Sequence, residues 1–489
     1  MNSLFLIVPI LLPLAGGLAI LLLQFKTEKS RMIFTETVAV LTSACVLAAL
    51  LTVNGDPVDV YSFTNGFSVT FCLDGLGKLF AGMVAVMWPL VLLYAFEYME
   101  KERRQNVFFA FYTMTYGVTL GVAFSADIVT MYLFFEMLTL VTIPLVAHYG
   151  THDSLFAARK YAAYTIGGAS LSFMAVVLTT VYGNAGAFLY GGSIGGDFDP
   201  VLMQIAFALG FFGMGAKAAV FPLHDWLPTA SVAPTPVTAL LHAVAVVNSG
   251  AFAVMRLTWY VFGTDFLMGT PVQMICIATA EFTLLFAAVK AIRERHFKRR
   301  LAYSTMSNLS YMLFGVMLMT PAGFTGAAAH MLFHGVIKIT LFMVAGAFMH
   351  NTGYSYIYEL NGVGRRMPVS FVCFTICAVS LTGIPPFCGF VSKWSLMTAG
   401  GESGTALGYA GVFCLIISAF LCAVYTLSIS VRAFFPVVGK DRFREDSGVH
   451  EAGKLMLVPI VIFTGANLLL GIFSGSIMTF LEKIAGGAV

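Results

Sequence analysis

Three ionisable side chains recur at four-residue steps inside an otherwise apolar stretch, AAAHMLFHGVIKITLF: His330, His334 and Lys338. In a helix, this spacing stacks all three on one face over two turns. Neutral imidazole both donates and accepts hydrogen bonds, and a lysine in low-dielectric surroundings can alternate between its charged and neutral forms. A single buried histidine usually has only a structural role, but two with a lysine in register indicate proton transfer.

Two opposite charges interrupt other apolar stretches. Glu136 lies in LFFEMLTLVTIPLVAH and Lys217 in GMGAKAAVFPLHDWLP. An ionisable side chain at the centre of a bilayer costs at least about 2.5–3.5 kcal/mol, so each one needs a partner, water or a function. We expect these two to pair. The pair is either a structural link between packed helices or part of an ion pathway, and its cost favours the pathway.

Proline residues mark two places where a helix is expected to break. Pro222 follows Lys217 by five residues, and Pro385-Pro386 precedes Lys393 in LTGIPPFCGFVSKW. A proline interrupts the hydrogen-bond ladder and leaves backbone groups unpaired, which is tolerated at membrane depth beside hydrated cavities. Lys217 and Lys393 therefore both lie close to predicted helix breaks.

Four further polar residues lie in or beside apolar stretches: His224, His242, Asn248 and Glu281. His242, in ALLHAVAVVNSG, is alone on its helical turn, so a structural and a functional role are equally consistent with it. Glu281 is a buried acid for which the sequence offers no partner. We expect His242 on the proton pathway and treat His224, Asn248 and Glu281 as secondary candidates.

Cofactor and metal motifs are missing from the sequence. It contains no GxxxxGK loop, HExxH, CxxCH or nucleophile elbow, and its eight cysteines show no CxxC spacing. We therefore expect no cofactor and no bound metal, and the energy for transport must come from an ion gradient or a partner subunit. The basic residues occupy short segments between helices instead of forming one patch, so nucleic acid is not an expected partner.

The composition requires a lipid bilayer as the surrounding solvent. Hydrophobic residues make up 59% and charged residues 10% of the chain, whereas soluble proteins carry roughly a quarter charged residues. Apolar runs long enough to cross the ~30 Å hydrocarbon core recur along the whole chain. They predict an all-α integral membrane protein with about fourteen spanning helices. The expected spans are 4–24, 33–53, 75–96, 107–125, 127–149, 157–182, 201–222, 234–258, 272–291, 301–319, 327–349, 369–398, 406–435 and 455–480.

The segments between these helices alternate in charge. Odd-numbered segments carry Lys26/Lys29/Arg31, Lys101/Arg103/Arg104, Arg159/Lys160, Arg293/Arg295/Lys298/Arg299/Arg300, Arg365/Arg366 and Lys440/Arg442/Arg444, and even-numbered ones carry Asp56, Asp59, Asp197, Asp199, Asp265 and Glu402. By the positive-inside rule, both termini lie on the non-cytoplasmic side. The first helix has no basic residue before it, so we expect it to be retained. The segment 224–233 should face the cytoplasm but carries no Lys or Arg, and Trp226 and the nearby prolines predict that it lies at the membrane interface instead.

The two predicted helix breaks lie five helices apart, which predicts an internal repeat. Residues 107–258 would form the first unit and residues 272–435 the second. An odd number of helices in each unit would invert the second copy, as in many ion-coupled transporters. We expect a single membrane domain over residues 1–489, with three flanking helices before the repeats and a final helix at 455–480.

Several long motifs closely resemble those of one family: FPLHDWLPTASVAPTPVTALLHAVAVV, RRLAYSTMSNLSYM, HMLFHGVIKITLF and GIPPFCGFVSK. The sequence resembles the antiporter-like subunits shared by respiratory complex I, Mrp-type cation/proton antiporters and membrane-bound energy-converting hydrogenases. The resemblance implies two inverted five-helix half-channels joined by a polar axis across the membrane plane. It matches the family's proton-conducting residues to Glu136, Lys217, His242, His330, His334, Lys338 and Lys393.

The resemblance also implies partners and a location. The partners would be other membrane subunits and, in some members, a peripheral cytoplasmic redox module, in an inner or cytoplasmic energy-converting membrane. Asn248 departs from the pattern because many relatives carry a lysine there, which shifts proton transfer onto His242 and water. The chain also ends soon after its last helix, without the lateral helix of the largest complex I subunit.

The cargo and the activity have alternatives. Carboxylates are natural Na⁺ ligands, but histidines and lysines outnumber acids inside the predicted helices, which favours protons. A Na⁺/H⁺ antiporter subunit that carries Na⁺ itself is the first alternative. A scaffold that only anchors partners through its basic segments is the second, and it leaves the buried charges unexplained.

Overall fold

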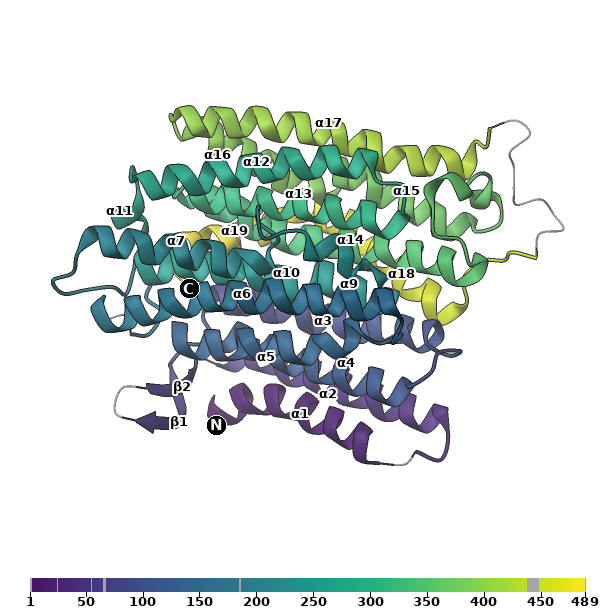
Figure 1. Cartoon of the computed structure of the whole chain (residues 1–489), viewed down its shortest axis with the longest axis horizontal. Coiled ribbons are helices and arrows are strands. Elements are labelled where there is room, and N and C mark those ends of the chain that lie inside the picture. The colour runs from purple at the N-terminus through teal and green to yellow at the C-terminus, as the bar shows by residue number, and fades with distance from the viewer. Residues whose placement is uncertain are drawn as a thin grey trace.

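The computed structural model describes residues 2–23, 25–53, 55–64, 67–183, 186–437 and 448–488. The predicted basic residues Lys440, Arg442 and Arg444 lie outside these ranges. The long helices run roughly parallel to one another, along the horizontal axis of Figure 1. Helix α1 lies at one edge of the bundle and α17 at the opposite edge, while α18 returns to the middle and packs against α3.

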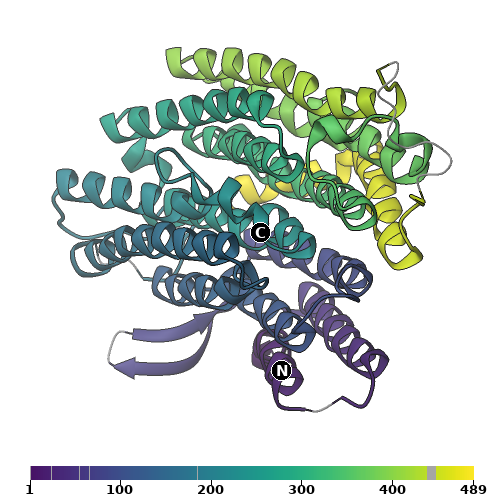
Figure 2. The same cartoon turned by 45° about the vertical axis from the view of Figure 1, so that its right-hand side comes forward.

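Three N-terminal helices and a β hairpin form the first edge of the bundle (Figure 1 and Figure 2). Their bounds are α1 (Asn2–Leu22), α2 (Glu28–Thr52), β1 (Val58–Thr64), β2 (Phe67–Phe71) and α3 (Gly75–Tyr98). The sequence analysis predicts no strand here. The two strands are antiparallel, with Val58 opposite Phe71. They are rich in β-branched and aromatic residues that alternate with polar ones, which suits a half-exposed strand.

Residues 105–267 form the first half of the remaining bundle. The elements are α4 (Gln105–Phe124), α5 (Ile128–Val146), α6 (His152–Tyr182), α7 (Pro200–Lys217), α8 (Trp226–Thr229), η1 (Ala230–Val232), α9 (Thr235–Ala243), α10 (Val246–Arg256), the π-helical turn η2 (Leu257–Phe262) and α11 (Thr264–Leu267). The side chains of Asp127, Thr151 and Asp199 cap α5, α6 and α7 by accepting hydrogen bonds from backbone N–H groups. These caps fix where the helices begin.

Residues 271–485 form the second half. The elements are α12 (Pro271–Arg293), α13 (Phe297–Met317), α14 (Pro321–Thr352), η3 (Ile357–Glu359), η4 (Val363–Arg365), α15 (Pro368–Thr382), α16 (Cys388–Glu402), α17 (Ala406–Phe434), α18 (Lys454–Ile472) and α19 (Ser474–Ala485). The prediction of one final helix at 455–480 is wrong, because the helix is interrupted at Phe473 and α19 follows as a separate amphipathic element.

Both proline-marked breaks are present. Helix α7 ends at Lys217 and helical structure resumes at Trp226, while α15 and α16 are separated by residues 383–387. Gly383 ends α15 with a φ of 98°, a conformation that favours glycine. A third break divides the predicted helix 234–258, because α9 ends at Ala243 and α10 begins at Val246. No proline marks this break, so the prediction of a continuous helix there is wrong.

Twelve helices within the described residues are long and apolar enough to cross a membrane, with α9, α10 and η2 counted together. Helix α13 is not among them because its sequence contains many polar residues. The halves α15 and α16 have 15 residues each, which is too short for a span unless they are taken together. Counting α13 as one further span, and α15 and α16 together as another, raises the number from twelve to the predicted fourteen. The chain is a multi-pass membrane protein.

Helix α14 occupies the centre of the bundle. It packs against α3, α9, α13, α15, α16 and α18, so almost all of its surface is buried by protein. In the segment 224–233, Trp226 is fully buried and donates a 2.8 Å hydrogen bond to the Ala216 carbonyl. The position of this segment at the membrane interface stays a prediction. The inverted relation between residues 107–258 and 272–435 stays a prediction.

Candidate functional site

Glu136 of α5 and Lys217 of α7 form the predicted pair. The Lys217 Nζ lies 3.8 Å from Glu136 Oε1, and Lys217 is fully buried. The same ammonium donates to the Phe135 carbonyl and lies 3.5 Å from the centroid of the Phe135 ring. Lys217 is also the last residue of α7, where the exposed carbonyls of the helix end attract a cation. Three partners of negative character therefore hold this ammonium.

The break between α9 and α10 lies between this pair and α14. A Cβ at Gly250 would lie 2.5 Å from the Ala218 nitrogen, so α10 closely approaches the end of α7. On the other side, a Cβ at Gly335 would lie 3.2 Å from the Ala243 carbonyl oxygen, so α14 approaches the end of α9. The broken helix thus connects the two halves of the bundle.

Several polar atoms at this break lack hydrogen-bond partners. Asn248 Nδ2 donates to the Ala243 carbonyl at 2.6 Å. Asn248 Oδ1, Ser249 Oγ and both ring nitrogens of His242 are buried and have no partner among the described residues. Buried polar groups are almost always satisfied, and where protein atoms are lacking, ordered water takes their place. The break is therefore a site that calls for internal water.

The α14 stripe has the predicted arrangement on one face. The rings of His330 and His334 are stacked with centroids 5.8 Å apart. His330 is bonded through Nδ1 to Ser392 Oγ at 2.9 Å and through Nε2 to Asn308 Oδ1 at 3.2 Å. Both nitrogens of His334 are buried without a partner among the described residues. His334 therefore resembles His242 in its need for water.

The two remaining lysines are each fixed by protein oxygens. Lys338 Nζ donates to Ser304 Oγ at 2.6 Å and to the Leu301 carbonyl at 3.3 Å. Lys393 Nζ donates to the carbonyls of Leu381 at 2.6 Å and Thr382 at 3.4 Å, which end the first half of the broken helix. Lys393 and Lys217 thus occupy similar positions, each beside the carbonyl end of a half-helix.

The sequence analysis assigns no role to several polar residues that line this axis. Lys298, taken as one of the cytoplasmic segment charges, is buried and donates to the Ala233 carbonyl at 2.7 Å. Asn308 Nδ2 donates to the Ser304 carbonyl at 2.7 Å, which links the partners of His330 and Lys338. The motif RRLAYSTMSNLSYM contains Ser304 and Asn308, and its unusual polarity was the available signal.

The secondary candidates lie apart from one another. Asn248 is at the break described above. His224 lies between α7 and α8, with its ring 5.4 Å from Phe221 and 5.2 Å from Phe286. Glu281 lies in α12, is 8% exposed, and has a buried Oε1 without a partner among the described residues. Among the described residues, neither His224 nor Glu281 forms a hydrogen bond or an ion pair with the axis residues.

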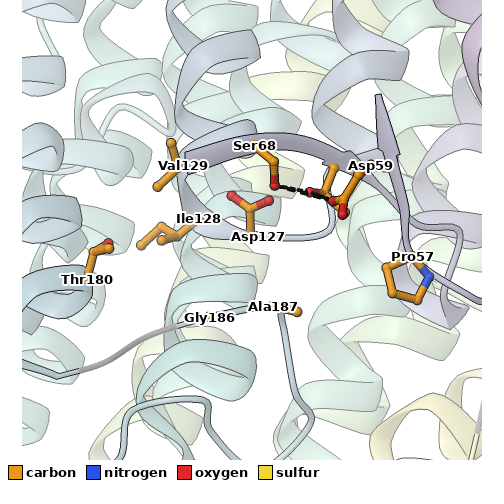
Figure 3. A pocket seen from close by; sticks show the side chains of 10 residues that line it. Pro57, Asp59, Ser68, Asp127, Ile128, Val129, Thr180, Gly186 and Ala187 are labelled. Carbon is orange, nitrogen blue, oxygen red and sulfur yellow. Dashed lines mark hydrogen bonds between the residues drawn. The ribbon is translucent and has the colours of Figure 1, made fainter. Parts of the chain in front are cut away.

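A separate polar cavity of about 300 Å³ lies at the start of α5, beside the β hairpin (Figure 3). Asp59 accepts hydrogen bonds there from Thr70 at 2.6 Å and Ser68 at 3.3 Å. Asp127 accepts from the Thr130 N–H at 2.7 Å. Burial raises the pKa of the Asp127 carboxyl, against the effect of its hydrogen bonds to Thr130. Asp127 precedes Glu136 by nine residues, or about 13 Å along a helix, so this cavity is distinct from the Glu136–Lys217 pair.

Two family models match this chain. A family model described as "NADH:quinone oxidoreductase/Mrp antiporter, TM" matches residues 125–421, which include Glu136, Lys217, His242, the α14 stripe and Lys393. The chain belongs to this antiporter-like family. A second model, described as "NADH-Ubiquinone oxidoreductase (complex I), chain 5 N-terminus", matches residues 62–109 of the antiporter-like chain. The resemblance drawn from the motifs is thus confirmed.

Curated relatives come from two kinds of complex. The chain is 27% identical over 446 residues to Na(+)/H(+) antiporter subunit A1 of Staphylococcus aureus, which covers 87% of this chain and 55% of that protein. It is 28% identical over 470 residues to NADH-quinone oxidoreductase subunit N of Desulforudis audaxviator, which covers 93% of this chain and 92% of that protein. The chain therefore spans about half the length of the A1 relatives that it matches.

Two solved structures share the fold of this antiporter-like chain. One is the membrane-bound sulfane sulfur reductase, an archaeal respiratory membrane complex, with a TM-score of 0.85 and 22% identity. The other is the Mrp complex from a Dietzia species, with a TM-score of 0.84 and 21% identity. Each match covers 100% of this chain and 97% of the other.

Proposed function

We propose that this antiporter-like chain conducts protons through the membrane as one subunit of a larger complex. The path runs from Glu136 and Lys217, past His242, to the α14 stripe and Lys393. The observation that carries this proposal is the series of buried, unsatisfied polar atoms at the α9/α10 break, between the two groups of charged residues. A purely structural ion pair does not need unsatisfied imidazoles beside it.

The Glu136–Lys217 pair is the first proton-exchange site. While the two side chains are in contact, the carboxylate stabilises the charged ammonium. If they separate, the buried ammonium loses its counter-ion and releases its proton. A positive charge that arrives at Glu136 from a neighbouring part of the complex can drive the separation of Glu136 from Lys217. The protonation of Lys217 is thereby coupled to the distance between the two side chains.

Water and imidazole carry the proton across the broken helix. Neutral His242 and His334 each offer one donor and one acceptor nitrogen, and all four ring nitrogens are free of protein partners among the described residues. Asn248 stands where many relatives have a lysine, and its amide can orient water but cannot hold a proton. His242 therefore takes over that step.

Further hydrogen bonds line the way towards Lys393, and internal water would join them into a proton path. Lys338 contacts Ser304, and Asn308 contacts both the Ser304 carbonyl and His330. His330 contacts Ser392, the residue before Lys393 in α16. Lys393 lies at the second helix break, where it exchanges a proton with one bulk phase. Each of these side chains is buried, so the proton is shielded from lipid along the way.

The proposed partners and location follow from the relatives. Other membrane subunits would drive the separation of Glu136 from Lys217, with a peripheral cytoplasmic redox module in a complex of the respiratory type. The membrane would be an inner or cytoplasmic energy-converting membrane, with both termini on the non-cytoplasmic side. The alternating charges of the connecting segments support this orientation.

A Na⁺/H⁺ antiporter subunit is the second candidate. The name of the Staphylococcus aureus relative supports it. The composition of the axis opposes direct Na⁺ binding, because Na⁺ prefers clustered oxygen ligands and the axis is built mainly from lysine and histidine nitrogens. In such a complex this chain would still carry the protons.

The test uses the native complex reconstituted in lipid vesicles. Lys217→Ala and Lys338→Ala should each lower proton transport by about tenfold or more, because each removes a proton-carrying group. The control is Lys29→Ala, an exposed lysine in the first turn of α2, which should leave transport unchanged. Parallel Na⁺ flux measurements distinguish the two cargoes. Normal transport by both axis variants would contradict the proposed function and support a scaffold.

A further inference from the structure

Asn467 carries an amide inside α18, a helix that contributes no residue to the proposed pathway. Its side chain is fully buried, and it lies outside residues 125–421, the part of the chain that the antiporter-like family model matches. Burying an amide is costly unless its donor and its acceptor find partners, and asparagine in a membrane finds them on neighbouring helices. The partners of Asn467 therefore show which elements α18 holds in place.

Asn467 contacts both halves of the broken helix α15/α16. Its Oδ1 accepts a hydrogen bond from Ser380 Oγ of α15 at 2.7 Å and another from the Cys388 thiol of α16 at 3.0 Å. Its Nδ2 lies 3.8 Å from Cys377 Sγ, about one turn before Ser380 in α15. Two accepted bonds occupy both lone pairs of the amide oxygen. One side chain of α18 thus joins the two half-helices.

Ser380 extends this contact to the first turn of α16. The N-cap residue of α16 is Phe387, whose side chain cannot accept a hydrogen bond, although the first N–H groups of a helix need partners outside it. The Gly389 N–H donates instead to Ser380 Oγ at 3.3 Å. A Cβ at Gly389 would lie 2.0 Å from the Ser380 carbonyl oxygen, so the half-helices meet too closely for a larger residue. A Cβ at Gly471 would lie 2.1 Å from the Pro386 carbonyl oxygen, so α18 is equally close to the break.

Lys393 makes the neighbouring contact between the same two half-helices. Its Nζ donates to the carbonyl of Leu381, the residue that follows Ser380 in α15. Ser392, beside Lys393 in α16, is bonded to His330 of the α14 stripe. A shift of α16 relative to α15 would therefore change the contacts of Lys393 and of His330 together. The amide of α18 opposes such a shift.

We infer that Asn467 is a positioning residue for proton transfer at Lys393. It ties α18 to both halves of the broken helix and thereby keeps the Lys393 ammonium beside the carbonyl end of α15. A misplacement of about 1 Å can lower the rate of a reaction about a hundredfold, so holding this geometry matters for transport. The inference rests on the proposed function, because Asn467 acts on transport only through Lys393 and carries no proton itself.

The test compares single variants of the native complex in lipid vesicles. Asn467→Leu keeps roughly the size of the side chain but removes the acceptor, so proton transport should fall by about tenfold or more. Asn467→Asp keeps an acceptor oxygen in the same place and should retain most of the transport. The matched control is Thr464→Val, about one turn before Asn467 in α18. The Thr464 hydroxyl donates to the Ile460 carbonyl of its own helix, so its loss should leave transport unchanged.

Labelling of Cys388 with a membrane-permeant maleimide reports the position of α16 directly. Its thiol is fully buried and is held by Asn467, so Asn467→Leu should make Cys388 react faster, while Asn467→Asp should not. Cys276 of α12, which is also fully buried, is the internal reference and should react as in wild type. A loss of transport in Asn467→Leu without faster labelling of Cys388 would overturn the positioning role.

Ser380→Ala provides a second variant if Asn467→Leu does not assemble. It removes the hydroxyl between Asn467 and the Gly389 N–H and should also lower transport. Normal transport in the variant that assembles, together with an inactive Lys393→Ala, would overturn the positioning role and leave the proposed function standing. Normal transport in Lys393→Ala would instead overturn the proposed role of Lys393. Equal losses in Thr464→Val or Asn467→Asp and in Asn467→Leu would assign the effect to the general packing of α18 and overturn the inference.

Discussion

Arg256 of α10 binds both carboxylate oxygens of Asp74, the residue that caps α3. The Nη2–Oδ1 distance is 2.6 Å, and Arg256 is 1% exposed. The guanidinium carbon lies 4.9, 5.0 and 4.6 Å from the ring centroids of Phe188, Phe252 and Tyr260. This contact fastens the first half of the bundle to the N-terminal helices.

Removing the carboxylate should strongly destabilise the protein. Asp74→Ala leaves the Arg256 charge buried without its counter-ion, and breaking such a pair costs about 3–5 kcal/mol of unfolding free energy. Denaturant unfolding in detergent would measure the loss. The control is Asp225→Ala, which removes the more exposed partner of Lys160 and should cost about 1 kcal/mol or less. Equal losses in the two variants would contradict a special role for the Asp74 contact.

The same carboxyl predicts a dependence of stability on pH. Burial alone would raise the pKa of Asp74, but the charge and hydrogen bonds of Arg256 outweigh burial and lower that pKa below its ordinary value of 3.8. Asp74 therefore stabilises the fold above the unfolded-state pKa of about 3.9, and this contribution is lost as the pH falls through the lower folded pKa. The stability difference between wild type and Asp74→Asn should shrink below about pH 4. A difference that does not change with pH would refute this prediction.

Asp127 should be replaceable by asparagine but not by alanine. Asparagine keeps the hydrogen bond that caps α5, whereas Asp127→Ala removes it and should cost about 1 kcal/mol. Because burial raises the pKa of Asp127, the fold disfavours its charged form, and Asp127→Asn should be at least as stable as wild type at neutral pH. Wild type should gain stability relative to Asp127→Asn as the pH falls through the raised pKa. Thermal unfolding of wild type and Asp127→Asn at neutral and at acidic pH measures this. Wild type that is more stable than Asp127→Asn at neutral pH, and loses that advantage at acidic pH, would contradict the prediction.

Asn248 should support proton transport by binding water at the α9/α10 break. Asn248→Leu removes an amide from the α9/α10 break and makes the site apolar, so proton transport in vesicles should fall by about tenfold. Asn248→Lys keeps a polar, proton-carrying group at the break and should retain transport, since its ammonium can replace the amide that now contacts the Ala243 carbonyl. Thermal unfolding of both variants serves as the control for folding. Full activity of Asn248→Leu would exclude water at this break as the route.

Local patterns in the sequence are enough to predict much of this protein. The spacing of His330, His334 and Lys338 places them on one face of a single helix, so no other part of the chain is needed to predict the stripe. The apolar runs predict the spans because each must cross the same hydrocarbon core. Prolines predict two helix breaks because a proline removes a backbone donor wherever it occurs.

Contacts between distant segments could not be predicted in the same way. No residue in the local sequence indicates the helix break after Ala243. The sequence around Lys298 indicates only a positive charge in a connecting segment, and its contact with the Ala233 carbonyl is known only from the structure. The amphipathic α19 is separated from α18 without a proline.

Hydrophobicity and helical periodicity are enough to predict a membrane protein with an acid–base pair, a His/His/Lys stripe and a lysine at a helix break. The atoms that those residues contact became known only from the packing of the helices. That packing placed Ser304 and Asn308 between Lys338 and His330, and it left the nitrogens of His242 and His334 without protein partners among the described residues. The physical reason is that hydrogen bonding and burial depend on how helices far apart in the chain pack together.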